Sequence, residues 1–303
     1  MELVSVIIPT HNRENLVGKA IDSVLAQTYK NVEIIVVDDA STDNTENMIN
    51  KNYFNEINYV KVEKSKGGNH ARNLGVQNAK GNYIAFLDDD DTWHSSKLEK
   101  QMNLFNNDSS IGLVYTGTKV IYTSTGHNYK NIPKIEGDLS DKIFIKNYIG
   151  TTSTVAMKKS IFEEAGGFDI KMPALQDYDL WIRVSQITKV APVQEALINY
   201  YNHDTGSQIS DNFGKIIDAS AKIEKKYSKI ISHLDDDIKI QRSIQKINNL
   251  GKRKMRAGNK KEARRYFLRS FKTKPHIISL SLYFASFLNH KTLVRLAGML
   301  KNE

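Results

Sequence analysis

Four consecutive aspartates follow a short apolar run in the first third of the chain. Residues 83–87 have the composition of a buried strand, and Asp88 to Asp91 come directly after them. Adjacent carboxylates repel one another, so bringing four of them together costs free energy unless a cation is shared. Mn²⁺ and Mg²⁺ take oxygen ligands and bridge to substrate phosphates. A solvated acidic loop is the alternative, but the position at a strand end favours a site for one of these metals.

Polar residues also follow two earlier apolar runs. Thr10 and His11 come after residues 3–8, and Asp38 and Asp39 come after residues 32–37. The carboxyl ends of parallel strands meet at one edge of a sheet, and ligands of open α/β sheets bind in the crevice at that edge. The sequence therefore predicts an active site where these polar groups meet the four aspartates.

The phosphate-binding groups that the sequence offers are few. It contains neither a P-loop nor a glycine-rich dinucleotide fingerprint. Any bound phosphate would then be held by a metal and by basic side chains. Arg72, in the segment GGNHARN, is a candidate for such a side chain, and a helix-surface arginine is the alternative interpretation.

The elements that would position these residues alternate along the chain. Apolar runs bounded by polar turns indicate strands, and apolar residues at helical spacing indicate helices. Strands are expected at 3–8, 32–37, 59–62, 83–87, 112–122 and 151–157, and helices at 16–25, 69–79, 97–105, 139–148, 161–165 and 177–186. The alternation predicts an α/β fold, a Rossmann-like and mostly parallel sheet flanked by helices.

Charge divides the chain into two parts. Residues 1–219 contain 22 basic and 28 acidic residues, whereas residues 220–303 contain 21 basic and 6 acidic residues. Beyond residue 213 the pattern is helical throughout, so we predict a catalytic domain at 1–215 and a smaller all-helical C-terminal domain at 216–303. The contrast in charge indicates two roles, one of them binding to an anionic surface.

Composition excludes several classes of protein. The 303 residues include no cysteine, so disulfide scaffolds, thiolate metal sites and thiolate nucleophiles are excluded. The first nine residues lack the basic and long apolar stretches of a secretory signal, so no signal peptide is expected.

The basic tail has a pattern of its own. Residues 252–274 contain eleven basic residues and one acidic residue, and residues 277–288 carry no charge. Twelve residues are too few to span a bilayer, which takes about 20. A basic helix before an aromatic-rich helix indicates binding to a membrane surface through Ile277, Leu280, Phe284, Phe287 and Leu288. A helical hairpin that packs these residues inside is the alternative, and residues 257–275 resemble one tetratricopeptide-type helix pair.

Six segments in order resemble those of a family 2 inverting glycosyltransferase with the GT-A fold, of the bacterial surface-polysaccharide type. The segments are VSVIIPTHNR, IIVVDDASTDNT, GGNHARNLG, YIAFLDDDDTW, GGFD and QDYDLWIRV. The resemblance covers about residues 3–210. It implies metal-dependent transfer of a sugar from a nucleotide-diphosphate donor, a UDP-sugar, to an acceptor hydroxyl.

The resemblance also implies roles for matching residues in the donor site. Pro9, Thr10 and His11 would line the nucleobase pocket, Asp39 would hydrogen-bond the base, and Arg72 would lie near the nucleotide.

The four aspartates match the Asp-x-Asp element of the family. Asp90 would bind the metal, and Asp88 and Asp89 would face the nucleotide-sugar. His203, in YYNHDTGS, lies where some relatives have a histidine that completes the metal site or contacts the diphosphate. A structural or exposed histidine is the alternative.

The segment QDYDLW matches the catalytic part of the family pattern. Asp177 corresponds to the catalytic base, with Asp179 as a weaker candidate whose other role is that of a first-turn helix carboxylate. Gln176 stands where an acidic residue is more usual, which puts acceptor recognition in doubt. Gln176 and Trp181 are the candidate acceptor contacts.

These features predict an enzyme that acts on a lipid-linked oligosaccharide. We expect it in the cytoplasm, peripheral at the anionic inner face of a bacterial membrane, with no nucleic-acid partner and with homo-oligomerisation left open. A protein acceptor is the first alternative. A basic nucleic-acid- or membrane-binding protein with a non-catalytic nucleotide-sugar-binding domain is the alternative from another class. Against nucleic acid, the aromatic residues of the tail follow its basic block rather than interleaving with it.

Overall fold

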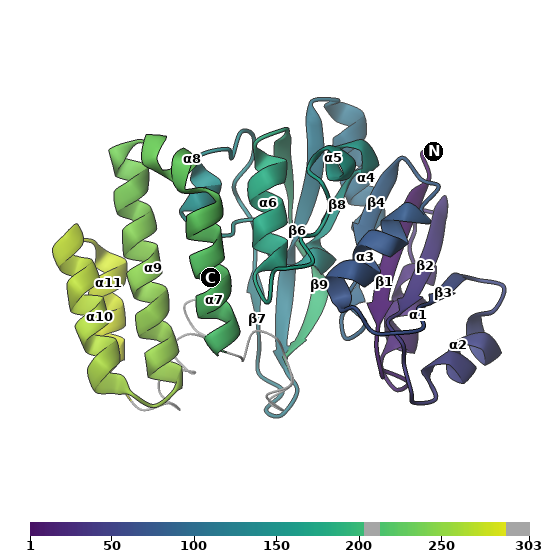
Figure 1. The fold of residues 1–303 in the computed structure, drawn as a ribbon, viewed down its shortest axis with the longest axis horizontal. Helices are drawn as coiled ribbons and strands as arrows, with labels where there is room; N and C mark the ends of the chain where they lie inside the picture. Colours follow the sequence, from purple (N-terminus) through teal and green to yellow (C-terminus); the bar gives the residue numbers. More distant parts are fainter. Residues whose placement is uncertain (203–212, 289–303) are drawn as a thin grey trace. The chain divides into compact units, whose positions relative to one another are not determined.

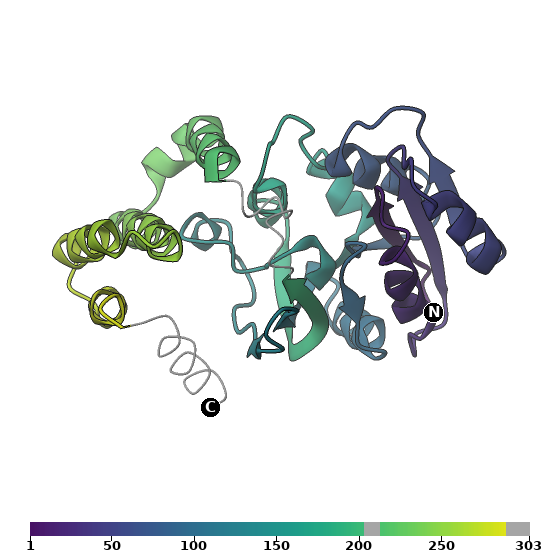
Figure 2. The same ribbon diagram turned by 90° about the horizontal axis from the view of Figure 1, so that it is seen from below.

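The computed structural model describes residues 1–202 and 213–288, and the chain divides into two compact units. The first unit comprises Met1–Leu139 and Tyr148–Ile223, and the second comprises Ser140–Asn147 and Glu224–Glu303. The predicted domain boundary at residue 215 falls inside helix α7 (Phe213–Lys226). Figures 1 and 2 show the chain from two directions.

Half of the sheet in the first unit is parallel. It consists of β3 (Asn58–Lys61), β2 (Val32–Asp38), β1 (Val4–Thr10) and β4 (Tyr83–Phe86), hydrogen-bonded in that order. Every residue of β1 is buried, because the strand lies inside the sheet with helices on both faces. The four strands predicted in this part of the chain are confirmed.

The other half also contains antiparallel pairs, so the sheet is mixed, although its longest pairings are parallel. β8 (Val155–Lys158) runs antiparallel to both β4 and β6 (Ile111–Tyr122). β9 (Lys189–Asn202) lies parallel to β6, and two short strands, β5 (Thr92–Trp93) and β7 (Asn128–Asn131), complete the nine strands of the described residues. No strand was expected at β9, whose pairing with β6 is interrupted by register shifts.

Helices cover both faces of the sheet in the first unit (Figures 1 and 2). One face carries α1 (Val17–Leu25) and α4 (Lys97–Asn107), whose apolar residues pack with alternate residues of β1 in a single core cluster. The other face carries α3 (Gly68–Gln77), where a side chain in place of Gly75 would collide with Ile7. Glycine is required there because helix and strand approach so closely. The remaining helices of this unit are α2 (Thr45–Tyr53), α5 (Lys159–Glu164) and α6 (Gln176–Ser185), together with most of α7, which ends in the second unit.

Two predicted elements differ from those observed. The helix expected at 139–148 is a single 3₁₀ turn, Lys142–Phe144, because one turn suffices to bury Ile143 and Phe144. The strand expected at 151–157 begins with a second 3₁₀ turn, Thr152–Thr154, and only its later part pairs as β8.

The second unit is helical in its described part. It contains α8 (Ser228–His233), α9 (Asp236–Arg256), α10 (Lys260–Thr273) and α11 (Ile277–Ala285). α9 and α10 pack closely, since Phe267 lies against Gly251 where a larger side chain would clash. Asn259 caps α10 by accepting a 3.2 Å hydrogen bond from the Glu262 amide. Among the helices of the described residues, none is long and apolar enough to cross a membrane.

Candidate active site

The three polar strand ends meet as expected. The hydroxyl of Thr10, at the end of β1, donates a 2.8 Å hydrogen bond to Asp89. Nδ1 of His11 lies 2.7 Å from the carbonyl oxygen of Asp39, and the Asp39 amide donates to the Thr10 carbonyl at 2.8 Å. Pro9 is buried in β1 directly before them. The ends of β1 and β2 and the turn after β4 therefore form one site.

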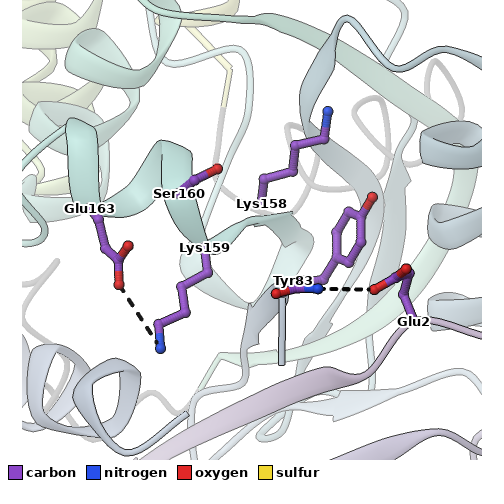
Figure 3. A pocket seen from close by; sticks show the side chains of 7 residues that line it. Glu2, Tyr83, Lys158, Lys159, Ser160 and Glu163 are labelled. Carbon is purple, nitrogen blue, oxygen red and sulfur yellow. Dashed lines mark hydrogen bonds and ion pairs between the residues drawn. The ribbon is translucent and has the colours of Figure 1, made fainter. Parts of the chain in front are cut away.

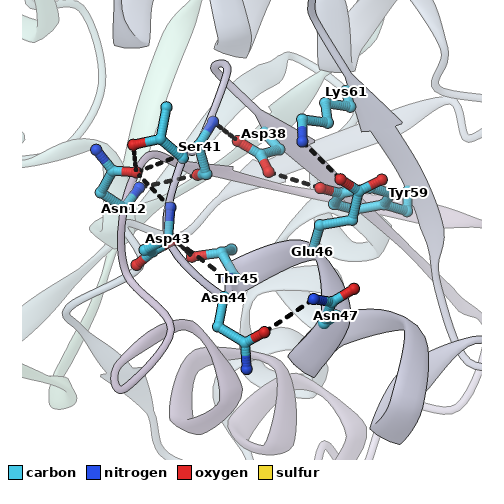
Figure 4. A network of polar contacts seen from close by, with 11 residues as sticks. Asn12, Asp38, Ser41, Asp43, Asn44, Thr45, Glu46, Asn47, Tyr59 and Lys61 are labelled. Carbon is cyan, nitrogen blue, oxygen red and sulfur yellow. Dashed lines mark hydrogen bonds and ion pairs between the residues drawn. The ribbon is translucent and has the colours of Figure 1, made fainter.

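Asp38 serves the structure of this site. Its buried carboxylate accepts a 2.6 Å hydrogen bond from the Tyr59 hydroxyl and a 2.7 Å bond from the Ser41 amide. Burial and the nearby carboxylate together raise the pKa of Tyr59, so the phenol remains a donor. Figure 4 shows this network, in which Asn12 also accepts a hydrogen bond from the Thr42 amide. Asp38 thus fixes the loop after β2 and is not available to a ligand.

Asp39 faces a different segment, the loop that leads into α3. Its carboxylate accepts hydrogen bonds of 2.7 Å from the Ser65 hydroxyl and of 2.8 Å from the amides of Lys66 and Gly67. Burial alone would raise the pKa of Asp39, but these donors outweigh it and the pKa is lowered. Asp39 is therefore a fixed anion at the site, and its predicted contact with the nucleobase stays a prediction.

Arg72 lies within the site, as expected, on the first turns of α3. Its Nη2 is 2.5 Å from Oδ1 of Asp88, and the guanidinium is buried beside the ring of Phe168. The hydroxyl of Thr152 lies 3.1 Å from both carboxylate oxygens of Asp88. Asp88 is thus oriented by a cation from one side and by a hydroxyl from the other.

Two other carboxyls of the turn, those of Asp89 and Asp91, have raised pKa values. Burial, with the charge of Asp90 next in size, raises the pKa of Asp89 to about 7. Burial, with the charges of Asp88 and Asp90, raises the pKa of Asp91 well above its usual range. The turn relieves its mutual repulsion in part by keeping protons, as crowded carboxyls do.

The donor groups of the turn fit a hard divalent cation. Mg²⁺ is commonly held by one or two carboxylates, with substrate phosphates and water completing its coordination. Asp90 is the predicted carboxylate ligand, while the described residues contain no group of three or more His, Cys, Asp or Glu side chains suited to a metal. His203, the other predicted ligand, lies outside the described residues.

Asp177 lies in the first turn of α6, and the charge of Asp88 in the aspartate turn contributes to its electrostatic environment. The helix begins after Leu175, which has a φ of 55°, and the Tyr178 amide donates a 2.7 Å hydrogen bond to the Asp177 carboxylate. Burial raises the pKa of Asp177 to about 6; the Tyr178 amide and Arg72 oppose the shift, and the charge of Asp88 adds to it. A carboxylate with a pKa this close to neutrality is suited to accept a proton.

Asp179 has a structural environment. It is fully buried, and its carboxylate pairs with Nη2 of Arg183 at 2.9 Å. The same guanidinium donates to the carbonyl of Ala165. This pairing anchors α6 and leaves Asp177 as the better candidate base.

The two candidate acceptor contacts differ in exposure. Gln176 is half-buried at the first position of α6. Trp181 is 0% exposed, and its indole N–H donates a 2.9 Å hydrogen bond to the Gly150 carbonyl. The assignment of Trp181 as an acceptor contact is therefore corrected: the side chain packs in the core and ties α6 to the segment that carries Thr152.

The sequence did not reveal Thr152 and Ser153 as part of the site. Ser153 donates a 2.7 Å hydrogen bond to Asp91 and accepts a 3.1 Å bond from the Asp88 amide. The signal available was a run of four polar residues, TTST, at the start of the strand expected at 151–157. Threonine is common in ordinary strands, so the pattern alone would not have assigned these residues to the site.

Backbone strain also concentrates at the site. Among the described residues, the non-glycine residues with φ in the left-handed region are Asn12, Ala40 and Leu175. Each directly follows or precedes a predicted site residue, namely His11, Asp39 and Gln176. Such conformations persist where the surrounding structure holds them, and they are frequent at functional sites.

A cavity of about 430 Å³ lies at the other edge of the sheet, where β1 and β4 begin (Figure 3). The ammonium groups of Lys158 and Lys159 already donate to the carbonyls of Ser109 and Ala79, at 2.6 and 2.7 Å. This cavity contains none of the predicted site residues.

An α/β sheet with an Asp-x-Asp turn at its carboxyl edge, and a carboxylate opposite on a following helix, defines a glycosyltransferase of the GT-A class. A family model described as "Glycosyl transferase family 2" matches residues 5–166. This match covers more than half of the chain, which therefore belongs to that family.

Two curated relatives illustrate the range of the family. An uncharacterized glycosyltransferase of Rickettsia typhi is 36% identical over 67% of this chain, which spans 64% of that protein. The Escherichia coli protein WfaP, named as a UDP-Glc:alpha-D-GlcNAc-diphosphoundecaprenol beta-1,3-glucosyltransferase, is 33% identical over 72% of this chain and 84% of its own.

Solved structures agree in fold. The crystal structure of Staphylococcus aureus TarS 1-349 in complex with UDP-GlcNAc matches 94% of this chain and 90% of its own, with a TM-score of 0.59 and 17% identity. At this identity the likeness shows the fold alone. This likeness confirms the predicted GT-A fold, and membership of the family confirms the predicted glycosyltransferase activity.

Proposed function

We propose that this enzyme transfers a hexose from a UDP-sugar to a sugar hydroxyl of a lipid-linked diphosphate acceptor, with inversion at the anomeric carbon. The name of WfaP supports a UDP-hexose donor and a diphosphoundecaprenol-linked acceptor. The single observation that carries the catalytic part is the placement of Asp177, whose pKa is raised to about 6 by burial and is also affected by the charges of Asp88 and Arg72.

Asp177 acts as the general base. Its carboxylate accepts the proton of the acceptor hydroxyl while the oxygen of that hydroxyl forms a bond to the anomeric carbon. The bond between the anomeric carbon and the β-phosphate oxygen breaks at the same time, and UDP leaves on the opposite face. One displacement of this kind inverts the configuration, and it needs one base on the acceptor side, the role that we propose for Asp177.

The donor lies along the strand ends. Pro9, Thr10, His11 and Asp39 would hold the base, as an anionic carboxylate can accept from a ring N–H. Arg72, Asp88 and Asp89 would face the ribose, diphosphate and sugar. Asp89 keeps a hydrogen bond from Thr10, which links the base-binding strand to the aspartate turn.

Asp90, with His203, would hold a Mn²⁺ or Mg²⁺ ion. When bound, such an ion neutralises the charge that grows on the leaving diphosphate. The oxygen ligands of the turn and the raised pKa of Asp89 support this proposal, because a cation would relieve the crowding of the carboxylates.

The proposed acceptor places the enzyme at a membrane. We infer that the protein works in the cytoplasm, peripherally at the inner face, because that is where a lipid-linked diphosphate acceptor and UDP-sugars would meet. If the acceptor were a protein, the enzyme would not need to work at a membrane.

Thermal stabilisation by nucleotide-sugars tests the donor. UDP-glucose, UDP-galactose, UDP-N-acetylglucosamine and GDP-mannose should be compared with and without Mg²⁺ or Mn²⁺, because a ligand that binds only the folded state raises the melting temperature. We expect a UDP-hexose with metal to give the largest shift, and Asp39→Asn to reduce it. A preference for GDP-mannose would contradict the proposed donor.

A further inference from the structure

Helix α11 is apolar on most sides, and several of its large apolar residues are exposed. Its buried positions are occupied by Ser279, and by Ser286 just after its end, whereas Ile277 is 76% exposed, Phe284 61% and Phe287 58%. Packed helices normally bury their apolar stripe and expose polar residues. Part of the apolar surface of α11, which includes Ile277, Phe284 and Phe287, therefore faces away from the helices on which it packs.

A hydrogen-bond network fixes this orientation. The Ser279 hydroxyl lies 2.7 Å from the hydroxyl of Ser270 on α10 and 3.1 Å from the amide oxygen of Asn248 on α9. All three side chains are buried. Turning α11 to bury its apolar side would leave these buried polar groups without partners, at a cost of about 1–3 kcal/mol for each. The exposure of the apolar side is thus a property of the packing in this unit.

The exposed apolar side adjoins basic residues. Tyr283, Phe284 and Phe287 form an aromatic cluster with ring centroids 5.4–5.6 Å apart. The Arg264 guanidinium lies 4.5 Å from the Phe287 ring, and the Lys260 ammonium donates to the Leu288 carbonyl at 2.7 Å. The end of α11 is therefore in contact with the start of the basic helix α10.

The outer face of α10 adds further positive charge. Lys261, Arg265, Leu268 and Lys272 are exposed, and their spacing places them on one face of the helix. Glu262 is the one acidic residue in 252–288, and it pairs with Lys254 at 3.0 Å. Within the described residues no carboxylate pairs with Lys261, Arg265 or Lys272, so this face keeps its charge.

We propose that the exposed apolar side of α11 and the basic face of α10 form a docking surface for an anionic lipid bilayer. Phenylalanine and isoleucine side chains enter the interface between headgroups and acyl chains, while lysine and arginine remain at the phosphates. A second copy of the chain fits less well, because it would bring two uncompensated basic faces together. A nucleic acid would satisfy the charge but would leave the apolar side uncovered.

This inference extends the proposed function. Docking would bring the enzyme to its lipid-linked acceptor, so the purpose of docking rests on that function. Binding to lipid is nevertheless a separate property, since the docking surface contains none of the residues placed in the active site. The two proposals therefore fail separately.

Flotation of the full-length protein with vesicles tests the docking surface. The vesicles would be phosphatidylglycerol and phosphatidylcholine in equal parts, or phosphatidylcholine alone, at low and high salt. We expect binding to the anionic vesicles that weakens with salt, and little binding to the neutral ones. A basic residue near an anionic surface contributes a factor of about five, so Lys261→Gln, Arg265→Gln and Lys272→Gln together should reduce binding by about a hundredfold.

The apolar part needs its own variant and controls. Phe284→Ser with Phe287→Ser should reduce binding about tenfold or more, from the apolar area that no longer enters the interface. Phe54→Ser, at a 74% exposed position of the first unit, is the matched apolar control. Lys19→Gln, Lys30→Gln and Lys51→Gln together, at exposed positions of the same unit, match the charge change. Neither control should alter vesicle binding, and none of the variants should alter UDP-sugar-dependent transfer to a soluble short-chain acceptor.

Several results would overturn the inference. One is failure of the wild type to bind anionic vesicles at low salt. Another is a loss of vesicle binding in the control variants equal to that in the docking-surface variants. A phenylalanine variant that turns a dimer into a monomer while vesicle binding persists would identify a second copy as the occupant. Displacement of the vesicles by duplex DNA at low salt would identify a nucleic-acid surface. Normal vesicle binding without any glycosyl transfer would leave the docking surface intact and refute the proposed function.

Discussion

One hydroxyl group closes the aspartate turn of the active site. Ser153 donates a 2.7 Å hydrogen bond to the Asp91 carboxyl and accepts a 3.1 Å bond from the Asp88 amide, so it binds both ends of the turn. Its own carbonyl accepts the indole N–H of Trp93 at 3.0 Å. The positions of Asp88 and Asp90 therefore depend on a residue that lies more than 60 positions further along the chain.

We predict that Ser153→Ala weakens donor use beyond its effect on stability. Loss of a buried hydroxyl costs about 1 kcal/mol of unfolding free energy. The turn would also lose its fixed geometry, and a misplaced ligand group can lower the rate by about tenfold to a hundredfold. The measurement is KM for the UDP-sugar and kcat, together with the melting temperature.

Thr154→Val is the matched control for Ser153→Ala. Thr154 is buried in the same 3₁₀ turn, but its hydroxyl donates to the carbonyls of Ile149 and Thr151 and not to the aspartates. It should lose comparable stability while keeping normal kinetics. Equal kinetic losses in both variants would mean that Ser153 has no specific part in positioning the turn.

Asp177→Asn should lower kcat by about a hundredfold or more, because general-base catalysis contributes at least that factor. Affinity for the UDP-sugar should change little, since the base acts on the acceptor. Asp179→Asn should instead lower the melting temperature, because it removes the buried carboxylate that pairs with Arg183. If Asp177→Asn turned over normally while Asp179→Asn was folded but inactive, the general base would be Asp179.

The rate should also depend on pH through Asp177. The base must be ionised to accept a proton, and its pKa is raised to about 6. At saturating donor and acceptor, kcat should be constant above that value and fall as the pH decreases through it. The residual activity of Asp177→Asn should lack this limb, so a wild-type limb that persists in the variant would point to another group.

Removal of divalent metal should abolish transfer, and added Mg²⁺ or Mn²⁺ should restore it. Asp90→Ala should lose the restoration because the turn then lacks the predicted metal ligand. Asp236→Ala, at an exposed position of the second unit, should behave as wild type. Full activity in excess chelator would exclude a metal requirement.

Much of the site could be predicted because its residues follow strands. Apolar runs ending in Thr10, Asp39 and Asp88 place these residues at one sheet edge from chain order alone. Asp177 required the resemblance to the family, since a carboxylate in a helix is not distinctive. The difference between Asp38 and Asp39 could not be predicted, because it depends on which neighbour, Tyr59 or the loop at 65–67, each carboxylate meets.

Other features depend on contacts between distant segments. Strand β9 pairs with β6 through an irregular register, and its sequence includes a proline, so no simple alternation identifies it. Trp181 lies on the apolar side of an amphipathic helix, but only the packed structure shows that it is fully buried. The exposed side of α11 reverses the usual expectation, because Ser279 is held inside by Asn248 and Ser270.

The central claim is transfer of a hexose from a UDP-sugar to a lipid-linked acceptor. The most direct measurement incubates the purified protein with UDP-glucose, Mg²⁺ or Mn²⁺ and N-acetylglucosaminyl-diphosphoundecaprenol, and analyses the lipid product by mass spectrometry and NMR. We predict an acceptor extended by one hexose in β linkage, with release of UDP, and no product with Asp177→Asn or excess chelator. An unmodified acceptor with UDP-glucose and the other UDP-hexoses, under conditions where a UDP-sugar stabilises the folded protein, would contradict the account.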